Sequence, residues 1–246
     1  MITQSQKLSH QSKHKTEWHQ HVTGQLFCIR RGMMMVQTEQ TQWALTPATI
    51  GWFPPQLRHC AWTVGKVEGH SVQLSVCGSD ALPQQPGVWP ADPFLLLLME
   101  RISQLDPQVE TAQREQHLLA VMMDEIRLAP PAPLQLMLPH DRRARRIAEQ
   151  LLLQPQNTLR QQELAAENGL SIRTLSRLFS EQTGLSFSRW RQQARILASI
   201  TWLLRGGPIS ETAMQCGYEN VSAFIAAFKL RFGMTPGAFR VLNSKA

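Results

Sequence analysis

Three histidines near the start of the chain have the spacing of metal ligands. His19 and His21 are two residues apart in a segment whose pattern predicts short strands, and such residues on one strand point to the same face. If His59 comes from a neighbouring strand, the three imidazoles could bind Zn, Ni or Fe. The same side chains could instead line a small-molecule pocket or be structural histidines, and the spacing leaves these alternatives open.

Basic side chains gather in the C-terminal part of the chain. Residues 1–138 contain ten Lys/Arg and eleven Asp/Glu, whereas residues 139–246 contain fifteen and seven. The net charge of +7 therefore comes entirely from the second part. This asymmetry favours a polyanionic partner, and nucleic acid before a membrane.

The basic part contains a weak internal repeat, with one copy at residues 164–191 and the other at 212–240. Five residue pairs recur in register: Ala165 with Ala213 and Gly169 with Gly217 at an offset of 48, then Phe179 with Phe228, Gly184 with Gly233 and Arg191 with Arg240 at an offset of 49. One residue inserted in the turn after Gly217 explains the change of offset. The register argues against two unrelated helical hairpins.

Each copy has the layout of a helix-turn-helix. A short helix carries a small residue where a second helix must pack closely, and a glycine then supplies the positive φ of the turn. Ser171 and Asn220 are the expected N-caps of the two second helices. Two such units in tandem indicate a DNA-binding domain.

Other chemistries find little support in the sequence. The four cysteines form no CxxC pair, no apolar run is long enough to span a membrane, and the first residues lack a secretory signal. No G-x-S-x-G, Walker A, H-E-x-x-H or G-x-G-x-x-G sequence occurs. We therefore predict a cytoplasmic protein that is not an enzyme, with no catalytic residue and no membrane partner.

The pattern along the chain predicts an α+β protein. Strands are expected at Leu26–Ile29, Met33–Gln37, Thr49–Phe53 and Ser71–Val76, and helices at Pro93–Leu105 and Ala112–Leu128. The expected divisions are a flexible N-terminus over 1–16, a sensing domain over 17–90, a helical hairpin over 91–128, a proline-rich linker over 129–140 and a DNA-binding domain over 141–242.

The second half resembles the DNA-binding domain of the AraC/XylS family of bacterial transcription regulators. The resemblance covers about residues 141–242, and its motif is met at Ile209, Ala213, Gly217-Tyr218, Ser222–Phe224, Phe228-Lys229, Phe232–Pro236 and Phe239-Arg240. It implies an all-α domain of seven helices in which a long helix, here about Ser186–Arg205, joins the two helix-turn-helix units.

The first half is similar to the cupin-type sensing domain of one branch of that family. The matching segments are His19-x-His21, Gly24–Leu26, Pro47–Gly51, Trp52–Pro55 and His59. The resemblance implies a small antiparallel β domain that binds an effector or a divalent metal. Metal-binding cupins usually add a glutamate, for which Gln25 is the nearest match, and a neutral amide is a poorer ligand.

The sequence offers aromatic residues for an effector pocket, and a small aromatic or heterocyclic effector is favoured over a sugar. The available side chains are Trp18, Phe27, Trp43, Trp52, Phe53 and Trp62, which are also ordinary core candidates. The hairpin over 91–128 matches the place where family members dimerise, although it could simply cover the sheet. A homodimer is expected, and RNA polymerase is a partner if the protein is an activator.

Base contacts are expected to come mainly from the first unit. Its second helix should present Arg173, Thr174, Ser176 and Arg177 to double-stranded DNA, and arginine can contact guanine O6 and N7 in bidentate fashion. The second unit should present Asn220, Val221, Ser222, Ile225, Lys229 and Arg231. These suit thymine methyls and phosphates better than base hydrogen bonds.

The sequence thus predicts an effector-responsive, sequence-specific transcription regulator. Its two helix-turn-helix units, with recognition helices about 34 Å apart, would enter successive major-groove segments. The alternative is a metal-dependent cupin enzyme that carries a nucleic-acid-binding module.

Overall fold

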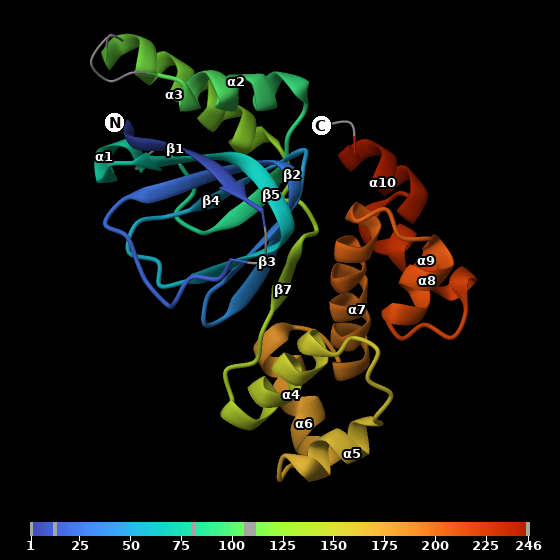
Figure 1. Cartoon of the computed structure of the whole chain (residues 1–246). Coiled ribbons are helices and arrows are strands. Elements are labelled where there is room, and N and C mark those ends of the chain that lie inside the picture. Colours follow the sequence, from blue (N-terminus) through green and yellow to red (C-terminus); the bar gives the residue numbers. More distant parts are fainter. Residues whose placement is uncertain (1, 12–13, 80–81, 106–111, 245–246) are drawn as a thin grey trace. The chain divides into compact units, whose positions relative to one another are not determined.

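The computed structural model describes residues 2–11, 14–79, 82–105 and 112–244, and it divides into two compact units. The first unit extends to Thr38 and resumes over Trp43–Gln135, whereas the second comprises Glu39–Gln42 and Leu136–Leu242. The first is built on an antiparallel sheet and the second is helical, which confirms the predicted α+β class (Figure 1).

The sheet follows the order β1-β5-β2-β3-β7, and β4 pairs with both β2 and β6. The strands are β1 (Ile2–His10), β2 (Gly24–Gln37), β3 (Thr41–Leu45), β4 (Thr49–Phe53), β5 (Cys60–Leu74), β6 (Gly87–Pro90) and β7 (Gln135–Met137). Every residue of β3 and β4 is buried. Because successive side chains alternate between faces, both faces of the sheet are covered there.

Two predicted strand boundaries were wrong. The segments Leu26–Ile29 and Met33–Gln37 belong to the single strand β2, whose pairing with β5 shifts register between Ile29 and Met33. Gly32 lies within this shift at φ 80°, so the strand bends through a bulge instead of ending. The segment predicted at Ser71–Val76 is the end of β5, and Val76 begins the short helix α1 (Val76–Ser79).

The N-terminus was expected to be flexible over residues 1–16, but Ile2–His10 forms β1. This strand pairs in antiparallel fashion with β5, and Ile2 is buried in the apolar core. Backbone pairing, which the polar composition does not reveal, holds the segment in place. Residues 12–13 lie outside the described residues.

Two helices cover the outer face of the sheet, as predicted, and they are α2 (Pro93–Ser103) and α3 (Ala112–Leu128). Their connection, residues 106–111, is outside the described part of the chain. The shared core consists of even-numbered strand residues and one side of each helix: Leu26, Cys28, Ile50, Trp52, Val72, Leu74, Leu95, Met99, Ile102, Leu119, Met122 and Ile126. Figure 1 shows the hairpin over the sheet.

Within the described residues, seven helices follow the sheet, the number that the AraC/XylS resemblance implied. They are α4 (Arg142–Leu153), α5 (Gln161–Glu167), α6 (Ile172–Thr183), α7 (Phe187–Leu204), α8 (Ile209–Gln215), α9 (Val221–Phe232) and α10 (Pro236–Ser244). Ser186 and Arg205 cap α7, so the long joining helix has the predicted bounds. The interval expected as a linker, 129–140, contains β7.

A search of the described residues for a helix with the length and hydropathy of a membrane span found none.

Candidate nucleic-acid interface and histidine cluster

The first helix-turn-helix consists of α5, a turn at Gly169 and α6. Ala165 on α5 is buried, and a larger side chain there would push the two helices apart. Gly169 has φ 64°, a conformation that glycine adopts without the steric cost of a Cβ. The turn therefore fixes α6 relative to α5.

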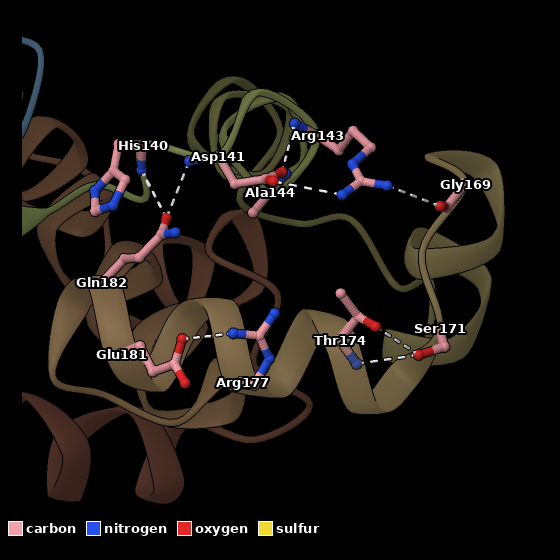
Figure 2. Close-up of polar contacts among 10 residues, drawn as sticks. All are labelled: His140, Asp141, Arg143, Ala144, Gly169, Ser171, Thr174, Arg177, Glu181 and Gln182. Carbon is pink, nitrogen blue, oxygen red and sulfur yellow. Dashed lines mark hydrogen bonds and ion pairs between the residues drawn. The ribbon is translucent and has the colours of Figure 1, made fainter.

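The N-cap and C-cap of α6 match the sequence prediction. The Ser171 hydroxyl accepts a hydrogen bond from the Thr174 amide at 3.1 Å, and Gly184 closes the helix in the left-handed conformation. Leu175, Leu178 and Phe179 are buried. The opposite face of α6 is thereby left to solvent (Figure 2).

The four side chains predicted to contact DNA from α6 differ in how they are engaged. Arg173 and Arg177 are both exposed, and Arg177 Nη1 lies 2.8 Å from Glu181 Oε2. Thr174 takes part in the N-cap, with its hydroxyl 2.9 Å from Ser171 Oγ. Ser176 Oγ accepts a hydrogen bond from Gln161 Nε2 at 2.8 Å. The two guanidinium groups are thus the strongest donors on the exposed face.

The second helix-turn-helix repeats this construction with α8, a turn at Gly217 and α9. The Asn220 carboxamide oxygen accepts from the Ala223 amide at 2.7 Å, and Gly233 closes α9 as Gly184 closes α6. Phe224 and Phe228 form the buried side. The predicted N-cap and register are confirmed.

The exposed face of α9 carries few hydrogen-bonding groups. Ser222, Ala226 and Lys229 are exposed, whereas Val221 and Ile225 are half-buried. Arg231 is also half-buried, and burial lowers the pKa of its guanidinium to about 10. Arg231 is therefore less accessible than the neighbouring Lys229.

Two arginines on α7, Arg191 and Arg195, were missed as structural residues by the sequence analysis, and we call them the arginine clasp. Arg191 Nη1 donates to the Leu159 carbonyl at 2.6 Å, and its Nη2 donates to the Asn157 carbonyl. Arg195 donates to the carbonyls of Pro155, at 3.1 Å, and Asn157, at 3.0 Å. The clasp thus binds the loop before α5 to the joining helix.

The clasp also contacts the second unit. A Cβ placed on Gly217 would lie 2.8 Å from Arg195 Nη2 and 3.0 Å from the Pro155 carbonyl oxygen. Gly217 therefore allows the turn between α8 and α9 to approach Arg195 and the first unit's loop together. Their spacing of four along α7 was a detectable signal, but it does not specify carbonyl partners.

The start of α4 is bound to the first unit by polar contacts (Figure 2). Gln182 Oε1 accepts from the backbone amides of His140, at 2.9 Å, and Asp141, at 3.0 Å. Arg143 Nη1 donates to the Gly169 carbonyl at 3.4 Å and pairs with Asp141. These contacts hold α4 against the turn that positions α6.

In the first unit, the structure brings the three predicted histidines together. The nitrogen ligand atoms of His19, His21 and His59 all lie within 4.8 Å of one another. His19 and His59 form an antiparallel bridge, and the ring of Phe53 stacks near His59. Gln25 is half-buried on β2 opposite Phe53, so alternation places it on the same face as these rings.

Burial keeps these histidines neutral. It lowers the pKa of His59 below the ordinary histidine value, against the opposing effect of a hydrogen bond to the Leu57 carbonyl. Burial and the neighbouring His19 also lower the pKa of His21. Neutral imidazole is the form that binds metals.

The aromatic residues offered for a pocket divide between two faces of the sheet. Phe27, Trp43 and Phe53 contact one another on the face near His59. Trp52 belongs to the core under the helices, where its Nε1 donates to Pro83. In the described structure, the buried indole N–H of Trp43 has no hydrogen-bond partner.

Comparison with known proteins identifies the C-terminal region. A family model described as a helix-turn-helix domain matches residues 164–241. The HTH-type transcriptional regulator NimR of Escherichia coli K12 is 27% identical over 221 residues, which cover 90% of this chain and 81% of NimR. The HTH-type transcriptional regulator RipA of Corynebacterium glutamicum is 36% identical over 102 residues, which cover 42% of this chain and 31% of RipA.

Among solved structures, ToxT from Vibrio cholerae aligns over 98% of both chains with a TM-score of 0.43 and 12% identity. The tandem helix-turn-helix units define a sequence-specific DNA-binding protein. The chain belongs to the AraC/XylS family of transcription regulators, as the matched domain and the named relatives show.

Proposed function

We propose that this regulator takes most of its base specificity from the first helix-turn-helix and uses the second mainly as an anchor. The observation that carries the proposal is the contrast between the two exposed helix faces. On α6 two exposed guanidinium groups stand one helical turn apart, whereas α9 exposes Ser222, Ala226 and Lys229. Bidentate arginine contacts to guanine discriminate between bases, and a lysine contact to phosphate does not.

Each predicted DNA residue receives a role in this proposal. Arg173 and Arg177 contact base edges, while Thr174 and Ser176, which are engaged within the domain, orient α6. Val221 and Ile225 contact thymine methyls, and Ser222 lies beside them. Lys229 binds phosphate, with Arg231 behind it, and Asn220 caps α9.

We further propose that the β unit is an effector-binding domain. The aromatic group of Phe27, Trp43 and Phe53 suits a flat apolar ligand. An unpaired buried N–H costs about 1–3 kcal/mol, so a ligand that accepts a hydrogen bond from Trp43 would recover that energy. A small aromatic or heterocyclic molecule with an acceptor atom fits both features.

The assembly and location are also proposals. Phe94 and Leu97 on α2 are 52% and 65% exposed, and their burial against a second copy would support a homodimer. The protein would work in the cytoplasm, where it meets chromosomal DNA, and RNA polymerase would be its partner at activated promoters. We propose no catalytic role, so the metal-dependent enzyme remains the alternative class.

Genome-wide mapping of bound DNA in the source organism tests the function. We expect discrete sites that share one motif, and occupancy at these sites should change when the effector is supplied. Sites upstream of a transporter or catabolic operon would also indicate the ligand class. Uniform, motif-free enrichment would contradict a sequence-specific regulator and favour the alternative class.

A further inference from the structure

We propose that His19, His21 and His59 together bind one divalent transition-metal ion. In the described part of the chain they are the group of three potential protein ligands found within 4.8 Å of one another. The cluster lies apart from the DNA-binding units, so the proposal goes beyond the function given above.

The backbone at each histidine is held in place. The His19 amide donates to the His59 carbonyl at 2.9 Å, and the His59 amide donates back at 2.8 Å. The Gln56 amide donates to the His21 carbonyl at 2.8 Å. Three ligands presented from fixed backbone positions lose little conformational entropy when they bind an ion.

Hydrogen bonds also select the ring tautomers. Nδ1 of His19 lies 2.7 Å from the Glu17 carbonyl oxygen, and Nδ1 of His59 lies 2.8 Å from that of Leu57. A carbonyl oxygen can only accept, so each Nδ1 carries the proton and each Nε2 keeps its lone pair. An imidazole whose other nitrogen donates to a carbonyl is the usual outer-shell arrangement of a metal-ligating histidine.

The distances require only a small closure of the rings. Metal–nitrogen bonds of about 2.0–2.1 Å place the nitrogens of a tetrahedral site roughly 3.3–3.4 Å apart. The largest separation in the cluster is at most 4.8 Å. Rotation of the half-buried His19 and His21 side chains toward the buried His59 can supply the difference.

The donor set defines the class of ion. Three neutral imidazoles suit Zn²⁺, Ni²⁺, Cu²⁺ or Co²⁺, whereas Mg²⁺ and Ca²⁺ require oxygen ligands. The described group contains no carboxylate and no thiolate. Three protein ligands also leave at least one coordination position for water or another ligand.

Titration of the chelator-treated full chain with Co²⁺ and with Zn²⁺ tests the proposal. We expect one equivalent of either ion to bind, and the Co²⁺ spectrum should show d–d bands without thiolate charge-transfer absorption. The variant His21→Gln should weaken binding by at least roughly 100-fold, the upper end of the effect of losing an outer-shell partner. His19→Gln should do the same, and circular dichroism checks that both variants fold.

The matched control is the double variant His10→Gln, His14→Gln. These two rings stack 4.5 Å apart but belong to no group of three, so binding should be unchanged. Absence of stoichiometric binding, equal affinity in His21→Gln, or loss of binding in the control would each overturn the proposal. DNA affinity measured on the same preparations separates this failure from a failure of the proposed function.

Discussion

At the scale of single residues, α6 carries the two side chains on which base recognition depends. Arg173 and Arg177 are exposed and one turn apart, and the buried Leu175 and Leu178 fix the face on which they stand. Arg177 pairs with Glu181 in the DNA-free protein. Base contact therefore requires this guanidinium to exchange a carboxylate for a guanine edge.

The variant Arg177→Ala should lose discrimination at one or two base positions. We expect a cost of about 1–3 kcal/mol on the preferred site and a smaller cost on sites mutated there, because a bidentate base contact is lost. Binding to a panel of single-base operator variants measures this. Lys229→Ala is the comparison, and it should weaken all sites equally and reduce the salt slope by about one. Uniform weakening by Arg177→Ala would assign Arg177 to phosphate.

The variant Glu181→Gln should bind DNA more tightly. Both partners of the Arg177–Glu181 pair are more than half exposed, with side-chain accessibilities of 57% and 56%, so the pair contributes about 0–1 kcal/mol. Its removal should raise affinity by roughly two- to fivefold in fluorescence anisotropy and leave thermal stability nearly unchanged. Glu149→Gln, which breaks the similar pair with Arg145 on α4, is the control. A drop in affinity would show that Glu181 holds Arg177 in its binding orientation.

Sequence patterns predicted the capping residues and the outward arginines because both follow from local rules of spacing and hydrogen bonding. They did not predict that Ser176 would bond to Gln161 or that Arg231 would be half-buried. Those facts depend on which helix packs alongside, and a single strand of sequence does not contain that information.

At the scale of elements, the relation between the two helix-turn-helix units depends on the arginine clasp. Arg195 contacts the Pro155–Asn157 loop on one side and the Gly217 turn on the other. The clasp was not predictable, because its partners are backbone carbonyls some forty residues away. The repeat predicted the two units, and the clasp is what fixes their relative position.

The turn glycines give a matched test of the clasp. Gly169 and Gly217 are repeat equivalents with φ of 64° and 77°, so alanine at either position should cost about 1–2 kcal/mol of strain. A Cβ at Gly169 meets nothing within 4 Å, whereas one at Gly217 meets Arg195 and the Pro155 carbonyl. Gly217→Ala should therefore be less stable than Gly169→Ala by roughly a further 1–3 kcal/mol. Urea unfolding measures both, and equal losses would mean that Arg195 moves aside freely.

At the scale of the whole molecule, the chain joins a β unit to a helical DNA-binding unit. The sequence predicted the helical unit closely because its periodicity, caps and turn glycines agree with one another. It predicted the β unit less well. The polar strand Ile2–His10 and the bulged strand Gly24–Gln37 owe their conformation to pairing with β5, which local pattern does not encode.

The protein's central property is unequal recognition by two successive units, and selection of bound duplexes from a random library by the full chain measures it most directly. We predict a bound site with two segments about one helical turn apart, in which the segment facing α6 is strongly conserved and contains guanine, and the segment facing α9 is weakly conserved. Equal conservation of both segments would contradict the proposed division of roles, and a library that gains no shared sequence would contradict sequence-specific recognition altogether.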